Sequence, residues 1–169
     1  MSRILLADPS VHAQRMGLQI LESEGFLIET ASDGSSALLK IREFDPLVVL
    51  ADVVLPGTSG YELCRIAKAQ ASLAIILTAS AQATIDTDLA QSVGSDGTLS
   101  KPFEATPLIK AVKRLSAQVT AERLRKLAPG VPDEMDRERV EAAVTLALEA
   151  AMPALVREIT ERVLVALRK

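Results

Sequence analysis

Cysteine, histidine and aromatic residues are scarce in this chain of 169 residues. It contains one cysteine, one histidine, one tyrosine, three phenylalanines and no tryptophan. Because Cys64 has no second cysteine, no disulfide can form within the chain, and a reducing compartment is expected. We expect Cys64 to be a small buried hydrophobic residue. His12 has no second histidine with which to hold a metal ion, so we expect a solvated position near a helix start.

Strongly basic segments and long apolar runs are also missing. The formal net charge is −3 and no block of lysine and arginine occurs, so we expect no nucleic acid partner. The first apolar run ends at Asp8, which makes it too short for a signal-peptide core. The apolar segment 142–156 contains Glu149 and Pro153 and is too short to span a bilayer. We therefore expect a cytoplasmic protein without a membrane span.

Short apolar runs alternate with longer amphipathic stretches along the first two-thirds of the chain. Runs at 4–7, 26–30, 47–51, 73–78 and 97–100 predict strands, and stretches at 11–24, 35–44, 60–69, 82–93 and 105 to about 125 predict helices. This alternation is typical of βαβ units around a parallel sheet. We therefore predict an α/β fold with a doubly wound, five-stranded parallel sheet.

Four polar residues stand at or just beyond the ends of predicted strands: Asp8, Asp52, Thr78 and Lys101. In an open parallel sheet, ligands bind outside the carboxyl ends of the strands. A phosphorylated aspartate needs a divalent cation, a fixed ammonium and a hydroxyl or amide around its oxygens. Two aspartates can hold magnesium, while the lysine and the threonine supply the other two groups. A cis peptide before Pro102 would aim Lys101 inward.

Two patterns that would indicate an enzyme are missing. No glycine-rich loop follows the first predicted strand, which argues against a nucleotide or flavin mononucleotide site. No second aspartate stands two residues after Asp52, which disfavours a phosphatase with an Asp-x-Asp pair. We therefore expect a protein that is not an enzyme.

Six segments resemble the receiver domain of two-component response regulators. They are 4–8 (ILLAD), 31–34 (ASDG), 52–57 (DVVLPG), 60–63 (GYEL), 75–79 (IILTA) and 101–103 (KPF). The resemblance implies a flavodoxin-like strand order 2-1-3-4-5 over residues 1–118. It also implies that Asp52 accepts a phosphoryl group from a histidine kinase. Magnesium would then be held by Asp8, Asp52 and the backbone carbonyl of Val54, and Thr78 and Lys101 would contact the phosphoryl group.

Two positions depart from the family pattern and leave two hypotheses open. Pro9 stands where the family has a second acid, so we expect weak magnesium binding. Thr98 stands where the family commonly has an aromatic or histidine switch residue, and threonine is too short for that motion. The leading hypothesis is a phosphorylation-dependent switch that signals through protein contacts. The alternative is a pseudo-receiver, acting as an adaptor or dimerisation scaffold without phosphorylation.

The remaining sequence predicts a helical extension. Residues 119–133 continue the last helix and end in a linker rich in proline and glycine. Residues 134–169 carry an apolar stripe at helical spacing, which predicts an amphipathic tail with Pro153 as a break or kink. Such a tail packs on its own domain, pairs with a second copy or binds a partner. We favour a homodimer through residues 134–169, beside an unknown downstream protein partner.

Overall fold

The computed structural model describes residues 2–127 and residue 145. Residues 2–127 form a parallel sheet covered by helices on both faces. The elements are β1 (Arg3–Ala7), α1 (Val11–Glu22), β2 (Leu27–Ala31), α2 (Gly34–Phe44), β3 (Val48–Asp52), α3 (Gly60–Gln70), β4 (Ala74–Ala79), α4 (Thr87–Ser92), β5 (Gly97–Ser100) and α5 (Ala105–Leu127). The strand order is β2-β1-β3-β4-β5, and every neighbouring pair is parallel. The predicted fold and strand order are confirmed.

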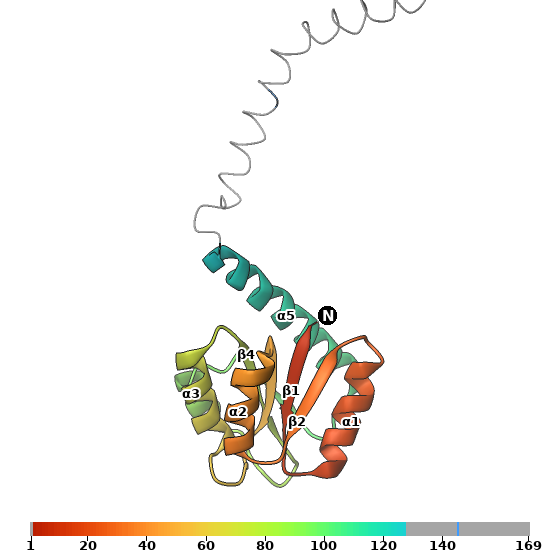
Figure 1. Ribbon diagram of the computed structural model, residues 1–169. Coiled ribbons are helices and arrows are strands. Elements are labelled where there is room, and N and C mark those ends of the chain that lie inside the picture. Colours follow the sequence, from red (N-terminus) through yellow and green to blue (C-terminus); the bar gives the residue numbers. More distant parts are fainter. Residues whose placement is uncertain (1, 128–144, 146–169) are drawn as a thin grey trace, which may run out of the picture. The chain divides into compact units, whose positions relative to one another are not determined.

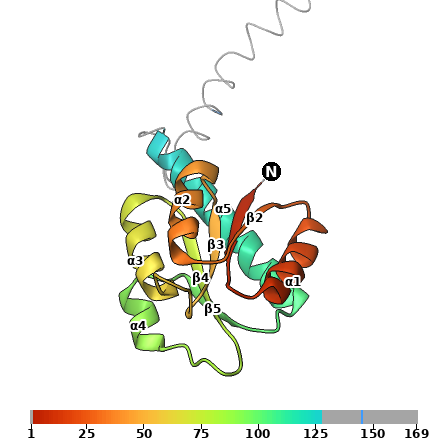
Figure 2. The same ribbon diagram turned by 60° about the horizontal axis from the view of Figure 1, so that its bottom comes forward.

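The sheet has an apolar core on each face. Successive side chains of β1 point to opposite faces, so Leu5 packs toward α2 and α3 while Leu6 packs toward α1 and α5. All five residues of β3 are buried, as the central strand of a parallel sheet requires. Figures 1 and 2 show α2 and α3 together on one side of the sheet, with α1 on the other. This double cover makes the strand ends the rigid base of a site.

Short polar residues begin the first four helices. Ser10, Asp33, Ser59 and Asp86 each accept a backbone N–H from the residue three positions later. A helix start leaves backbone N–H groups without partners, and these side chains satisfy one of them. The caps therefore determine where each helix begins above the strand ends.

The fourth helix is shorter than the sequence predicted. We expected a helix over 82–93, but α4 comprises only Thr87–Ser92. The carboxylate of Asp86 caps this helix by accepting the N–H of Leu89, and the N–H of Asp86 donates to the hydroxyl of Tyr61 at 2.8 Å. These two bonds place the helix start at Asp86. Residues 80–86 therefore form a loop that follows β4.

The C-terminal part of α5 continues past the sheet and is held by Arg123. Its guanidinium donates to the carbonyls of Ser72 (2.7 Å) and Pro46 (3.0 Å) and pairs with Asp45 at 2.9 Å. Asp45 also pairs with Arg3 at 2.9 Å. These contacts join the end of α5 to the loops before β3 and β4, as one compact unit that ends at Leu127.

The predicted tail cannot be compared with the structure. Residues 128–133 of the predicted linker lie outside the described residues, and so does the tail at 134–169 except for Thr145. The proposed homodimer and the domain boundaries remain predictions. Among the described residues, no helix is both long enough and apolar enough to cross a membrane.

Candidate functional site

The four residues that the strand ends predicted lie together at the carboxyl edge of the sheet. Asp8 follows β1, Asp52 ends β3, Thr78 lies near the end of β4 and Lys101 follows β5. Asp52 and Thr78 are register partners on adjacent strands. Asp8 and Thr78 are fully buried, and Asp52 is 5% exposed. Because the strands are parallel, residues far apart in the sequence reach one edge.

The ammonium of Lys101 joins the two carboxylates. Its Nζ donates to Oδ2 of Asp8 at 2.7 Å and to Oδ2 of Asp52, and the lysine side chain is only 10% exposed. Burial by itself would lower the pKa of Lys101, but the bonds to Asp52 and Asp8 outweigh burial and raise this pKa. The peptide bond between Lys101 and Pro102 is cis, the geometry that the sequence raised as one way to aim Lys101 inward. A charged lysine thus lies between two buried acids.

The second oxygen of each carboxylate is bonded to backbone. Oδ1 of Asp8 accepts the N–H of Ser10, and Oδ1 of Asp52 accepts the N–H of Val54, both at 2.8 Å. A backbone bond on one oxygen and a lysine bond on the other fix the orientation of each carboxylate. A glycine at the start of α3 permits close approach here, because a Cβ on Gly60 would lie 2.2 Å from the carbonyl oxygen of Asp52.

The hydroxyl of Thr78 has no hydrogen-bond partner among the described residues, although it is fully buried. Buried hydroxyl groups are nearly always bonded, because an unbonded one is costly. Thr78 is beside Asp52 in the sheet register. An incoming oxyanion beside Asp52 could accept a hydrogen bond from this hydroxyl.

The site offers a magnesium ion two carboxylates, Asp8 and Asp52, because Pro9 stands where the family has a further acid. Among the described residues, no group of three or more His, Cys, Asp or Glu side chains is close enough to hold a metal ion. Pro9 directly follows Asp8 and contributes no side-chain oxygen. Magnesium is usually held by one or two carboxylates, with carbonyls and water completing its six ligands. Asp8 and Asp52 are therefore the two carboxylates that could hold the ion, and the carbonyl of Val54 as a further ligand stays a prediction.

Gln14 is a site residue that the sequence reasoning missed. Its Nε2 donates to the carbonyl of Asp8 at 2.6 Å and lies 3.3 Å from the carbonyl of Ala31. The side chain therefore holds the ends of β1 and β2 together behind the carboxylate. One signal was available: Gln14 stands three or four residues from Val11, Gly17 and Leu18, so it is a polar residue on an otherwise apolar side of the first helix.

The other residue at which the sequence departs from the family pattern, Thr98, lies on the outer strand β5. Thr98 is exposed and is the register partner of Leu77, beside Thr78. Its short side chain reaches solvent directly, so it fills no buried pocket behind the site.

Comparison with known proteins identifies the family. The family model described as response regulator receiver domain matches residues 4–113. The chain belongs to this receiver family. The DNA-binding response regulator MtrA of Mycolicibacterium smegmatis is 34% identical over 111 residues, which are 66% of this chain and 49% of that protein. The CpxR homolog of Haemophilus influenzae, a transcriptional regulatory protein, is 33% identical over 115 residues, which are 68% and 50%.

Solved receiver structures have the same fold. A receiver domain protein described as CheY-like from Methanospirillum hungatei has a TM-score of 0.66 at 27% identity and covers 72% of this chain and 98% of its own. The chemotaxis protein CheY4 of Vibrio cholerae has a TM-score of 0.62 at 28% identity, with coverage of 68% and 98%. This receiver chain spans about half the length of the curated relatives that it matches. Like its family, it is a signalling protein of the two-component type.

Proposed function

We propose that this receiver domain is a switch in which Asp52 accepts a phosphoryl group from the phosphohistidine of a histidine kinase. The observation that carries the proposal is the hydroxyl of Thr78, which is buried beside Asp52 and has no hydrogen-bond partner in residues 2–127. The ammonium of Lys101 is bonded to the same carboxylate. One nucleophile therefore has a hydroxyl donor on the adjacent strand and a bonded cation.

The transfer is an exchange of a P–N bond for a P–O bond. A carboxylate oxygen of Asp52 attacks phosphorus, and the electron pair of the breaking P–N bond stays on the imidazole, which takes up a proton. Oδ2 of Asp52 already accepts from Lys101, so a phosphoryl group on this side would lie within reach of the ammonium. Thr78 would donate to a second phosphoryl oxygen. Bound magnesium would add positive charge, held by Asp8, Asp52 and the Val54 carbonyl.

The route from the site to the surface runs through the loop after β4. Thr78 and Ala79 end β4, and the loop 80–86 leads to Asp86, whose N–H is bonded to the hydroxyl of Tyr61. A hydroxyl that turns toward phosphate would displace this loop relative to α3. The result would be a changed surface around α4 for a protein partner. The kinase, the downstream partner, the expected lack of a nucleic acid partner and the cytoplasmic location stay predictions.

Tyr61 provides the assay, because it is the chain's only tyrosine and no tryptophan is present. Its fluorescence should change when magnesium and beryllofluoride are added together, since the mimic would pull Thr78 and the loop that ends at Asp86. Asp52→Ala should abolish the change. Asp88→Ala, an exposed aspartate on α4, should preserve it.

The pseudo-receiver alternative predicts a different result. Lys101 already satisfies both carboxylates, and Pro9 leaves the site one acid short. If acetyl phosphate and beryllofluoride leave fluorescence and intact mass unchanged even at high magnesium, the switch proposal is wrong. The domain would then act as an adaptor without phosphorylation.

A further inference from the structure

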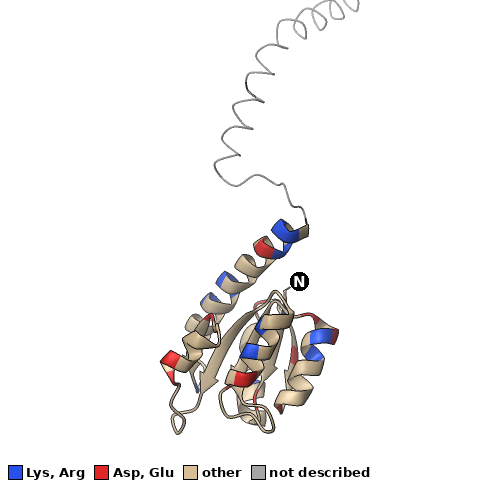
Figure 3. Cartoon of the chain, turned by 90° about the vertical axis from the view of Figure 1, so that its left-hand side faces the viewer, with Lys and Arg blue, Asp and Glu red and all other residues tan. Residues whose placement is uncertain are grey.

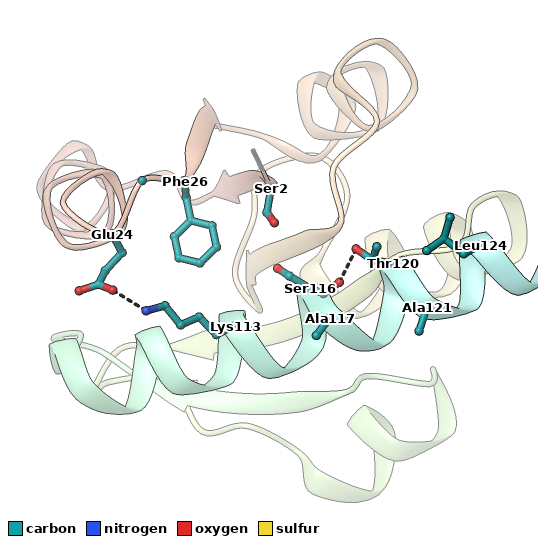
Figure 4. A pocket seen from close by; sticks show the side chains of 10 residues that line it. Ser2, Glu24, Phe26, Lys113, Ser116, Ala117, Thr120, Ala121 and Leu124 are labelled. Atoms are coloured by element: carbon teal, nitrogen blue, oxygen red, sulfur yellow. Dashed lines mark hydrogen bonds and ion pairs between the residues drawn. The ribbon is translucent and has the colours of Figure 1, made fainter. Parts of the chain in front are cut away.

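A groove lies on the edge of the domain away from the phosphorylation site, between α5 and the turn that joins α1 to β2. Its volume is about 560 Å³, and most of its lining is apolar. Figure 4 shows the side chain of Phe26 over one face of α5. We call it the α5 groove; its lining includes Phe26, Ser116, Ala117, Thr120, Ala121 and Leu124.

The α5 wall of this groove is made of small residues bounded by a leucine. Ala117, Thr120 and Ala121 are exposed, and Leu124 is 60% exposed. Residues three and four positions apart share one side of a helix. Small side chains in such a row allow another helix to approach closely, and the leucine closes one end of the row. The shape therefore fits the side of a helix.

The hydroxyl of Ser116 lies at the base of the groove without a partner. The residue is 5% exposed, and among the described residues no group bonds to its Oγ. Its carbonyl, in contrast, accepts the hydroxyl of Thr120 at 2.8 Å (Figure 4). A buried hydroxyl gains a hydrogen bond when a polar group enters the groove. Ser116 is thus a second unpartnered hydroxyl, remote from Thr78.

The edge of the groove is basic. The helix α5 contains six lysines and arginines and one glutamate, and Figure 3 shows the basic residues as blue bands and the acidic one in red. Three of these residues lie next to the groove without lining it: Lys110, Arg114 and Arg125. Each stands three or four residues from a lining position (113, 117 or 121), so they are neighbours of the lining on the helix surface. None of these three forms an ion pair with the residues that the structure describes.

The opposite wall adds little negative charge. Its acid, Glu24, pairs with Lys113 at 2.6 Å, which neutralises both groups (Figure 4). A second copy of α5 would bring its own basic edge against this one, and like charges repel. The unpaired positive edge instead complements a partner with acidic residues.

We propose that the α5 groove binds an amphipathic helix of another protein. That helix would place small and apolar residues against Ala117, Ala121 and Phe26, a polar group against Ser116, and glutamates along the edge with Lys110 and Arg125. The groove lies at the amino-terminal ends of the strands, so it can be occupied whether or not Asp52 is phosphorylated. It would therefore recruit a partner independently of the switch.

The test is fluorescence anisotropy with the full chain and two labelled helical peptides. Both carry alanine and leucine on one face, with one glutamine among them to bond the hydroxyl of Ser116; one has glutamates on both flanks, and the other has lysines. The acidic peptide should bind about tenfold more tightly at low salt, because the edge charges are unpaired. Equal affinity for the two peptides would overturn the proposal.

Variants locate the binding. Ala121→Glu places a carboxylate in the groove and should weaken binding of the acidic peptide about tenfold. Ala69→Glu, the same change on the exposed face of α3, should have no effect. Ser116→Ala should weaken binding about fivefold, the effect of one hydrogen bond, without lowering stability, because the removed hydroxyl has no partner among the described residues. If Ala121→Glu and Ala69→Glu behave alike, the peptide binds elsewhere and the proposal fails.

The same experiment distinguishes two other occupants of the groove, a segment of residues 128–169 and a second copy of the chain. If residues 1–127 bind the acidic peptide and the full chain does not, a segment from 128–169 fills the groove and the partner proposal is wrong. If the full chain is a dimer that Ala121→Glu converts to a monomer, a second copy is the occupant, and the proposal is again wrong. A full chain whose mass is unchanged by Ala121→Glu and which binds the acidic peptide supports it.

Discussion

Replacing Thr78 by valine should stabilise the resting protein and impair its switch. The two side chains have nearly the same shape, and the change removes a fully buried hydroxyl that has no partner among the described residues. Such a group costs about 1–3 kcal/mol. We expect Thr78→Val to raise the free energy of unfolding by about 1–2 kcal/mol, or the melting temperature by about 3–5 °C per kcal/mol in a domain of this size.

The same variant should respond poorly to beryllofluoride. A hydrogen bond to a charged group contributes about 1.5–3 kcal/mol, so the affinity of the mimic should fall about 10- to 100-fold. Thr98→Val is the matched control, because Thr98 lies exposed on the adjacent strand β5. Its stability should change by less than about 0.5 kcal/mol.

Urea unfolding and a beryllofluoride titration followed by Tyr61 fluorescence measure both effects. A loss of stability in Thr78→Val would mean that the hydroxyl has a partner in the folded protein. Equal gains in Thr78→Val and Thr98→Val would indicate a general preference for valine in strands. Unchanged affinity for the mimic would refute the assigned phosphoryl contact.

Three further predictions follow from other parts of the domain. Pro9→Asp should raise magnesium affinity about tenfold or more in calorimetry, while Pro9→Ala should not, because the added carboxylate is a hard oxygen ligand. Arg123→Ala should lower the free energy of unfolding in urea by about 1–3 kcal/mol, since two carbonyls and Asp45 lose a donor, whereas the exposed Arg125→Ala should change it by less than about 0.5. Burial raises the pKa of the Cys64 thiol to about 11 from 9.0, so the unfolded thiol ionises first and stability should fall as pH rises from 9.0 toward 11. This fall should be shallower in Cys64→Ala.

Several features of the fold followed from local patterns. An apolar run such as 47–51 must be buried on both of its faces, so it forms a central strand with helices above and below the sheet. The prediction failed at 82–86, where a polar segment of helix-compatible residues forms a loop. There the competing interaction is tertiary, because the hydroxyl of Tyr61 accepts the N–H of Asp86 at 2.8 Å and places the cap. No pattern within the segment contains that contact.

The candidate site divides in the same way. The sequence by itself determined that Asp8, Asp52, Thr78 and Lys101 would meet, because parallel strands place their carboxyl ends at one edge, and it determined that Pro9 would leave one acid missing. Only the tertiary structure decided that Lys101 would join both carboxylates and that Gln14 would hold the carbonyl of Asp8. It also decided that the hydroxyls of Thr78 and Ser116 would have no partner within the part of the chain that the structure describes. Such outcomes depend on differences of a few tenths of an ångström in the distances between residues far apart in the chain. The packing of the two cores sets those distances.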